Sequence, residues 1–174
     1  LAVMYRGERG EKEAIEERIG QMRQEGHEVH PVMNRVTAIS STQLRRLIAF
    51  QCAGEFLPVG VGEYIRENGL YDAGANWKGL PMEQLEPIVL RLLKPNRVAH
   101  VLGCRDTAVP LAKRWGADEN DAARAGLLHD ITKALDGPLQ LTLCREYGTI
   151  LDEFDYKYPK TLHALTGSLV AQRI

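Results

Sequence analysis

The chain has 174 residues, of which 44% are hydrophobic and 26% charged, and its formal net charge is −1. This composition is that of a folded globular protein and excludes a mainly disordered chain. Because the basic residues are scattered among acids, we expect neither nucleic acid nor an anionic membrane as a partner. No apolar run approaches the ~20 residues of a membrane span and the start lacks a secretory signal pattern, so the sequence predicts a cytoplasmic location.

The three cysteines argue against a covalent or zinc-ribbon framework. Cys52, Cys104 and Cys144 are far apart, odd in number and in no C-x-x-C pair. Neither a disulfide scaffold nor a zinc ribbon has this spacing. We therefore predict reduced thiols that are mostly buried.

The first 32 residues have the pattern of a β-α-β unit. Residues 1–6 (LAVMYR) and residues 27–32 (HEVHPV) are of strand type, and Gly26 ends the helix predicted between them. Strand-helix-strand order is typical of an α/β layer with a parallel sheet. Two strands and one helix leave a sheet face and an edge without partners, so we expect the rest of the sheet upstream of residue 1.

Two short helices and a linker are predicted next. Ser40 followed three residues later by Gln43 forms a capping box that opens a helix, and a second helix (GEYIREN) ends at Gly69. Residues 72–81 contain Gly and Pro without any period. That composition is typical of a connection between domains.

From residue 82 onward every periodic segment is helical, so residues 82–174 are predicted to form an all-α domain. Asp118 is placed as an N-cap, Pro138 as the first helical residue, and Gly148 as a helix stop. Pro87 and Pro110 fall inside helical patterns, where each should bend or locally break the helix. The predicted helices span residues 82–93, 96–115, 119–134, 138–147 and 160–174.

Four side chains of this helical domain suggest a metal site. His100, the adjacent pair His129 and Asp130, and His163 each fall on a predicted helix, and imidazole with carboxylate suits iron, manganese, cobalt or zinc. A single histidine is more often a surface or core residue. The adjacent pair favours a site, because it follows an apolar run, residues 125–128, where an unpaired carboxylate would be costly to bury.

Three segments around these residues resemble one family of enzymes. The stretches LKPNRVAHVLGCRDTAVPLAKRWGAD, AARAGLLHDITK and YPKTLHALTG are similar to the HD-superfamily symmetrical diadenosine tetraphosphate hydrolases over essentially all of residues 82–174. The resemblance implies a helical bundle with a two-metal centre, usually iron. The family pattern is a His, an adjacent His-Asp, two further His and a final Asp. His100, His129, Asp130 and His163 match its first four positions; we expect the remaining two downstream of residue 174, and therefore weak metal occupancy and little hydrolysis by this chain.

The same resemblance implies roles for single residues. Asp130 would bridge the metals, and Lys133 would face the site and neutralise substrate phosphate as a point charge; a solvated helix lysine is the alternative for Lys133. Cys104 lies four residues after His100 on the same helix face, where the family usually has an aliphatic residue. We therefore predict that Cys104 is a core residue and not a ligand.

A second group of residues suggests a phosphate site. Hydroxyls and backbone N–H groups at a helix N-terminus, with an arginine one turn later, can bind phosphate, although such a pattern is first of all a capping device. The motif ISSTQLRR, followed by YIRENGLY, resembles the C-terminal part of nicotinate-nucleotide adenylyltransferase over residues 1–71. That resemblance implies that ATP phosphates contact Ser40, Ser41, Thr42 and Arg45.

Together these patterns predict an α/β fragment from the end of a Rossmann-like nucleotidyltransferase (residues 1–71), a linker (72–81) and an HD phosphohydrolase domain (82–174). The predicted parent couples nicotinate mononucleotide adenylylation to hydrolysis of diadenosine tetraphosphate, with small-molecule nucleotides as partners. A homodimer stays open. The alternatives are an HD phosphohydrolase of another nucleotide and a non-catalytic HD domain that binds a nucleotide and regulates the transferase.

Overall fold

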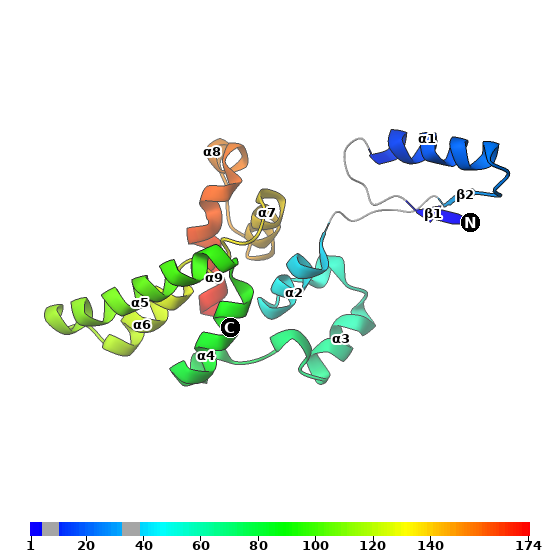
Figure 1. The fold of residues 1–174 in the computed structure, drawn as a ribbon. Coiled ribbons are helices and arrows are strands. Elements are labelled where there is room, and N and C mark those ends of the chain that lie inside the picture. Colours follow the sequence, from blue (N-terminus) through cyan, green and yellow to red (C-terminus); the bar gives the residue numbers. More distant parts are fainter. Residues whose placement is uncertain (5–10, 33–38) are drawn as a thin grey trace. The chain divides into compact units, whose positions relative to one another are not determined.

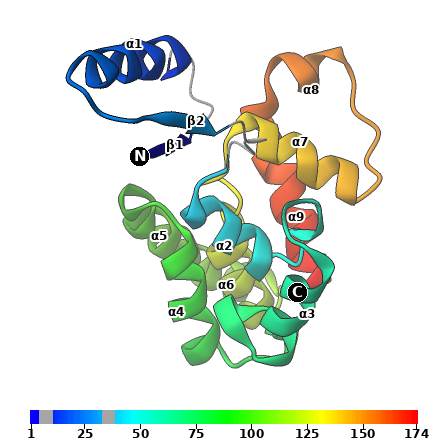
Figure 2. The same cartoon turned by 90° about the vertical axis from the view of Figure 1, so that its right-hand side faces the viewer.

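The computed structural model describes residues 1–4, 11–32 and 39–174. The chain forms two compact units, Leu1–Ser41 and Thr42–Ile174, and Figures 1 and 2 show their elements from two directions. The division falls at the start of helix α2 (Ser41–Ala49).

The first unit is a β-α-β unit, as the sequence predicts. Strand β1 (Ala2–Met4) pairs in parallel with β2 (His30–Val32), and helix α1 (Glu11–Gln24) lies between them in the chain. The end of the predicted first strand, at residues 5 and 6, lies outside the described residues. Two strands confirm the parallel pairing, but they are too small a sheet to identify a Rossmann-like domain.

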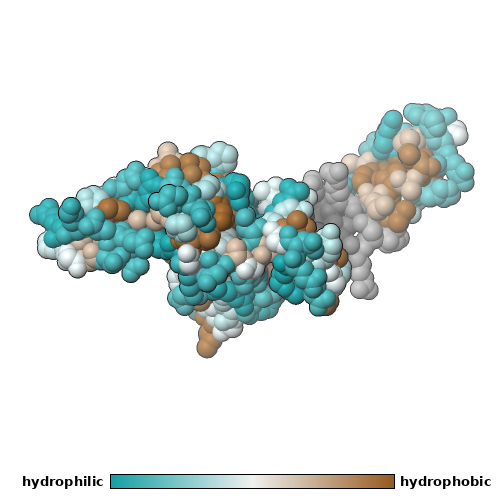
Figure 3. Space-filling model, turned by 90° about the horizontal axis from the view of Figure 1, so that it is seen from below, coloured by the Kyte–Doolittle hydropathy of each residue, from teal (hydrophilic) through white to brown (hydrophobic). Residues whose placement is uncertain are grey.

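Much of the apolar surface of this unit is exposed. The relative exposure is 67% for Leu1, 64% for Met4 and 37% for Val32, whereas Ile19 and Val29 are buried. Brown, apolar atoms gather on this unit in the space-filling view (Figure 3). Such exposure follows from the geometry, because one helix can cover only one face of a two-stranded sheet.

The second unit is helical throughout, and the described residues from 42 onward include no strand. None of the helices in the described part of the chain is long and apolar enough to cross a membrane. After α2 the α-helices are α3 (Val59–Glu67), α4 (Met82–Leu92), α5 (Pro95–Trp115), α6 (Glu119–Leu128), α7 (Gly137–Glu146), α8 (Glu153–Lys157) and α9 (His163–Arg173). Short 3₁₀ turns are η1 (Gly54–Phe56), η2 (Leu70–Asp72), η3 (Trp77–Gly79) and η4 (Pro159–Leu162).

Several predicted helix boundaries are confirmed by their capping contacts. The Asp118 side chain accepts a hydrogen bond from the backbone N–H of Asp121 at 2.8 Å, which fixes the start of α6. Gly148 follows α7 with φ of +63°, a left-handed conformation that ends a helix and favours glycine. Pro138 is the second helical residue rather than the first, because Asp136 is the N-cap of α7. Neither Pro87 nor Pro110 interrupts its helix.

The predicted helix over residues 119–134 is wrong at its C-terminal end. α6 stops at Leu128, and residues 129–134 form successive tight turns. Their backbone bonds join residues three apart, from the N–H of Ile131 to Leu128 O at 3.0 Å and from the N–H of Lys133 to Asp130 O at 2.9 Å. The predicted final helix also begins later, at His163, and α8 was not predicted.

The predicted linker over residues 72–81 packs within the second unit. Trp77 is only 2% exposed, and the Arg124 guanidinium donates to Trp77 O at 2.6 Å and to Leu80 O at 2.9 Å. Arg46 on α2 similarly donates to Leu92 O at 2.7 Å. The compact unit therefore begins at Thr42, about 30 residues earlier than the division inferred from the family resemblances.

Candidate metal centre

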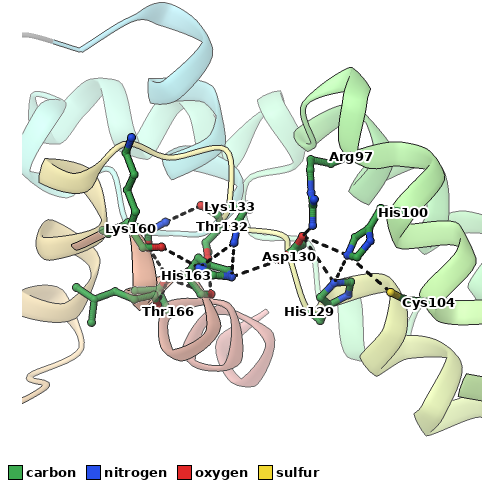
Figure 4. Close-up of polar contacts among 12 residues, drawn as sticks. Arg97, His100, Cys104, His129, Asp130, Thr132, Lys133, Lys160, His163 and Thr166 are labelled. Carbon is green, nitrogen blue, oxygen red and sulfur yellow. Dashed lines mark hydrogen bonds and ion pairs between the residues drawn. The ribbon is translucent and has the colours of Figure 1, made fainter. Parts of the chain in front are cut away.

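Three helix ends bring the predicted metal ligands together (Figure 4). His100 lies in the second turn of α5, His129 caps the C-terminus of α6, Asp130 follows in the tight turn, and His163 is the first residue of α9. The Nε2 atoms of His100 and His129 are 3.2 Å apart. Because α6 ends just before His129, the free carbonyls of its last turn lie next to the side chains of His129 and Asp130.

The Asp130 carboxylate lies at the centre of this group. Its Oδ2 is 3.7 Å from Nε2 of both His100 and His129, and its Oδ1 is 3.6 Å from Nε2 of His163. Asp130 is only 2% exposed. The two oxygens of one buried carboxylate thus face two different sets of imidazoles, which is an arrangement that could serve two cations.

Backbone carbonyls orient two of the imidazole rings. His129 Nδ1 donates to Gly126 O at 2.7 Å, and His163 Nδ1 donates to Lys160 O at 2.8 Å. With the proton held on Nδ1, each Nε2 carries the lone pair and faces Asp130. This second contact of a ring is what fixes the tautomer and direction of a metal-ligating histidine.

Arg97 is a member of the site that the sequence prediction missed. Its guanidinium hydrogen-bonds to Asp130 Oδ2, three residues before His100 on the same helix. Burial would raise the pKa of Asp130, but the Arg97 hydrogen bond, then the charges of His129, Arg97 and Lys133, outweigh it and hold that pKa below its usual value. The spacing from His100 was the available signal, because residues three apart share a helix face.

Lys133 lies beside His163. Its Nζ donates to His163 Nε2 at 2.7 Å. Lys133 stands on the tight turn and not in a helix, and it is half-buried, so it is not a freely solvated lysine.

A buried polar network under the site was not predicted. The Thr166 hydroxyl donates to Gln140 Oε1 at 2.6 Å and lies 2.9 Å from the Thr132 hydroxyl, while the Gln140 amide donates to Thr132 O at 2.7 Å. The Thr132 hydroxyl in turn contacts His163 O at 2.9 Å. All three side chains are at most 1% exposed. The network joins the turn after Asp130 to α7 and α9, and so holds His163 in place.

The prediction that Cys104 is a core residue is wrong. Its side chain is half-exposed, unlike the buried Cys52 and Cys144, and its Sγ is 3.7 Å from His100 Nε2. The donor atoms of His100, Cys104 and His129 all lie within 4.8 Å of one another. Because residues four apart on a helix are neighbours, α5 presents an imidazole and a thiol side by side.

The donor set fits a divalent transition metal. Bond lengths of about 2.0 Å to nitrogen and 2.3 Å to sulfur place tetrahedral ligands about 3.3 Å (N to N) and 3.5 Å (N to S) apart. The corresponding separations are 3.2 Å between the imidazole nitrogens and 3.7 Å from the thiol to His100. Nitrogen, carboxylate oxygen and sulfur together suit zinc, cobalt or iron better than magnesium or calcium.

Two residues of the second predicted group lie at a cavity elsewhere in the helical unit. Thr42 and Arg45, from the predicted phosphate motif, line a cavity of about 430 Å³. The guanidinium of Arg45 lies 5.5 Å from the centre of the Tyr71 ring, and Arg91 pairs with Asp72 at 2.9 and 3.0 Å. The structure does not place Ser40 and Ser41 among the lining residues, which are Thr42, Arg45, Arg46, Gly69, Tyr71, Asp72, Arg91 and Leu92.

The comparisons agree with this geometry. Residues 97–167 match the family model described as HD domain, a range that includes all the residues around Asp130. A relative described as bis(5'-nucleosyl)-tetraphosphatase, symmetrical, from Halalkalibacterium halodurans is 37% identical over 83 residues, which cover 45% of this chain and 44% of the relative. The chain thus spans less than half the length of that relative. No solved structure matches the chain significantly.

Proposed function

We propose that the chain is a metal-dependent phosphohydrolase of nucleotides, with His100, His129, Asp130 and His163 as metal ligands. The observation that carries the proposal is the buried Asp130 carboxylate, whose two oxygens face imidazole nitrogens at 3.6 and 3.7 Å. When bound, such metals lower the pKa of water and offset phosphate charge. The protein's own part is to hold these donors in a fixed geometry before substrate arrives.

Two cationic side chains beside Asp130 suit a polyphosphate substrate. Arg97 donates to Asp130, and the Lys133 ammonium is 2.7 Å from His163 Nε2. Guanidinium can bind two phosphate oxygens at once, whereas ammonium acts as a point charge. We assign both to phosphate binding, where their charges would be attracted to the substrate and would orient its bridge toward Asp130.

A shallow, open hollow along one face of α5 adjoins the candidate metal centre. It has a volume of about 560 Å³ and lies along α5, where His100 and Cys104 form one end and Thr107, Ala108 and Leu111 the other. Leu111 is 49% exposed. An apolar shelf adjoining a cationic site can hold a base or ribose while the phosphates reach the metals.

Within nucleotides, we propose dinucleoside polyphosphates as the substrate and diadenosine tetraphosphate as its representative. The proposal is supported by the name of the partly matching relative and by the family resemblance of the three segments. In this hydrolysis the water oxygen bonds to phosphorus, the central P–O–P bridge breaks, and two molecules of ADP leave. We further propose an iron centre, and nicotinate mononucleotide adenylylation as a second activity of the parent protein.

The test is product analysis with the purified chain, diadenosine tetraphosphate and Fe²⁺ without oxygen, and with Mn²⁺, Co²⁺ and Zn²⁺ in parallel. Because only four of the family's six ligand positions fall in this chain, we expect slow release of ADP as the single product. Metal retention and this slow turnover should both be lost in His129→Ala and Asp130→Ala. His30→Ala is the matched control, because this exposed histidine of the first unit pairs with Glu28 at 3.0 Å. Turnover that survives loss of the Asp130 carboxylate would refute the assignment.

The products separate the alternatives. Equal amounts of AMP and ATP would exclude symmetrical cleavage, and turnover of a mononucleotide alone would favour another HD phosphohydrolase. Nucleotide binding with metal retained but with no turnover of any nucleotide would favour a regulatory binding module.

The arginine-lined cavity favours a second nucleotide site, which we propose binds phosphate. Three arginines and one carboxylate line it, so its walls carry an excess of positive charge. Arg91 is already paired with Asp72, which leaves Arg45 the better candidate for phosphate. Isothermal titration with ATP should show binding that weakens in Arg45→Met but not in His129→Ala, and equal affinities in all three proteins would refute the site.

A further inference from the structure

The cysteine on α5 lies beside the four predicted metal residues but was not counted among them. Cys104 follows His100 by one helical turn, and its sulfur is 3.7 Å from the nitrogen that faces the metal position. The same sulfur belongs to a set of three donor atoms, with those of His100 and His129, that fall within 4.8 Å of one another.

We infer that Cys104 is a metal ligand, and that its thiolate shares one cation with His100, His129 and Asp130. The inference rests on the metal centre proposed above and adds a sulfur donor to it. A coordinating thiol loses its proton on binding a cation, so one negative charge joins that of the carboxylate beside two neutral imidazoles.

The local structure leaves the sulfur available for this role. Burial and hydrogen bonds occupy the other two thiols, since Cys52 is fully buried and contacts the Tyr147 hydroxyl, and Cys144 is buried in α7. Cys104 is half-exposed at the edge of the hollow along α5. Cys104 and His100 are one turn apart on the same regular helix, so the helix itself holds the sulfur beside the imidazole.

A thiolate changes which cation the site prefers. Sulfur is a soft donor that favours zinc, cobalt and iron over manganese and magnesium. Oxygen and nitrogen donors alone would leave the preference to the general order of divalent affinities. We therefore expect Cys104 to raise the ratio of zinc affinity to manganese affinity. Removing even an outer-shell partner of a metal site lowers metal affinity by about 10-fold or more, so Cys104→Ala should lower this ratio by at least about 10-fold.

The experiment uses Co²⁺ alone as a spectroscopic probe of the whole chain, without nucleotide. We expect a thiolate-to-cobalt charge-transfer band in the near ultraviolet in wild type and in Cys144→Ala, and its loss in Cys104→Ala, which should still show the visible d–d bands of bound cobalt. In parallel, Zn²⁺ should protect Cys104 of the wild-type chain from iodoacetamide, as read by peptide mass spectrometry. This second readout requires no substitution and so does not depend on a variant's folding.

The outcomes distinguish the two levels of the proposal. Cobalt binding without the charge-transfer band, or a band that persists in Cys104→Ala, overturns the thiolate ligand and leaves the His-Asp centre standing. Wild-type protein that binds neither Co²⁺ nor Zn²⁺ overturns the metal centre itself, and the thiolate with it. Equal alkylation of Cys104 with and without Zn²⁺ also counts against its ligation.

Discussion

Thr166→Val should destabilise the helical unit by about 2 kcal/mol, because it removes one hydroxyl from the network beneath the metal centre. The substitution removes the hydrogen bond of 2.6 Å that the Thr166 hydroxyl donates to Gln140 Oε1. Thr132 keeps its contact with His163 O at 2.9 Å. One buried acceptor without a partner costs about 1–3 kcal/mol. For a unit of ~130 residues, with an unfolding entropy of about 2.1 cal/mol/K per residue, 2 kcal/mol corresponds to a fall in Tm of about 7 °C.

The assay is urea unfolding followed by circular dichroism, with Thr161→Val as the matched control. Thr161 is exposed and bonds only locally, to Tyr158 O at 2.8 Å, so its replacement should change stability by no more than about 0.5 kcal/mol. Gln140→Leu removes the stranded acceptor, and in that background Thr166→Val should cost at least about 0.5 kcal/mol less. Equal costs of Thr166→Val in both backgrounds would refute the reasoning.

Two further predictions concern packing and pH. Gly126→Ala should destabilise the helical unit by roughly 1–3 kcal/mol in the same unfolding assay, because the added Cβ would meet Arg105 Cα at 2.7 Å and push α6 away from α5. The control is Gly103→Ala, whose added Cβ would meet no atom within 4 Å and which should stabilise the protein slightly. Equal effects of the two substitutions would contradict the packing argument. Burial, then the hydrogen bond and charge of Cys52, raise the pKa of Tyr147 well above its ordinary value of 10. The folded state therefore holds the Tyr147 proton more tightly than the unfolded state, so this group's contribution to the free energy of unfolding is complete below about pH 10 and is lost as pH rises further. Urea titrations at increasing pH should show a steeper loss of stability at alkaline pH for wild type than for Tyr147→Phe. Parallel curves for the two proteins would contradict the pKa shift.

The helical part of the fold could be predicted from the sequence because its signals are local. Capping at Asp118 and the stop at Gly148 depend on neighbouring residues, and both are found in the structure. The end of α6 was missed for the opposite reason. Residues 129–134 have helical composition, but the turn is held by distant partners such as Gln140, whose amide bonds to Thr132 O at 2.7 Å. Tertiary contacts of this kind override local propensity.

The candidate site divides in the same way. His129 and Asp130 stood out because the pair is adjacent and follows an apolar run, a pattern visible in one line of sequence. Arg97 was not singled out, and Cys104 was predicted to be a core residue, since an arginine or cysteine one turn from a histidine is ordinary in a helix. Their place beside His129 and Asp130 depends on the packing of α5 against the end of α6, which the sequence alone does not show.

That packing depends on a glycine. Gly126 lets α6 pack directly on the backbone of α5, because a Cβ at this position would lie only 2.7 Å from Arg105 Cα. The Gly126 carbonyl also accepts the Nδ1 proton of His129 at 2.7 Å. One residue therefore sets both the distance between the helices and the direction of an imidazole. His100 and Cys104 lie on α5, whereas His129 and Asp130 follow α6. A shift of one helix would therefore move the first pair of donors away from the second. We therefore expect the close packing at Gly126 to affect the candidate metal site as well as stability, and Gly126→Ala to weaken Co²⁺ binding even where the protein remains folded. Unchanged cobalt affinity in folded Gly126→Ala would show that the donors are held by the turn after His129 instead.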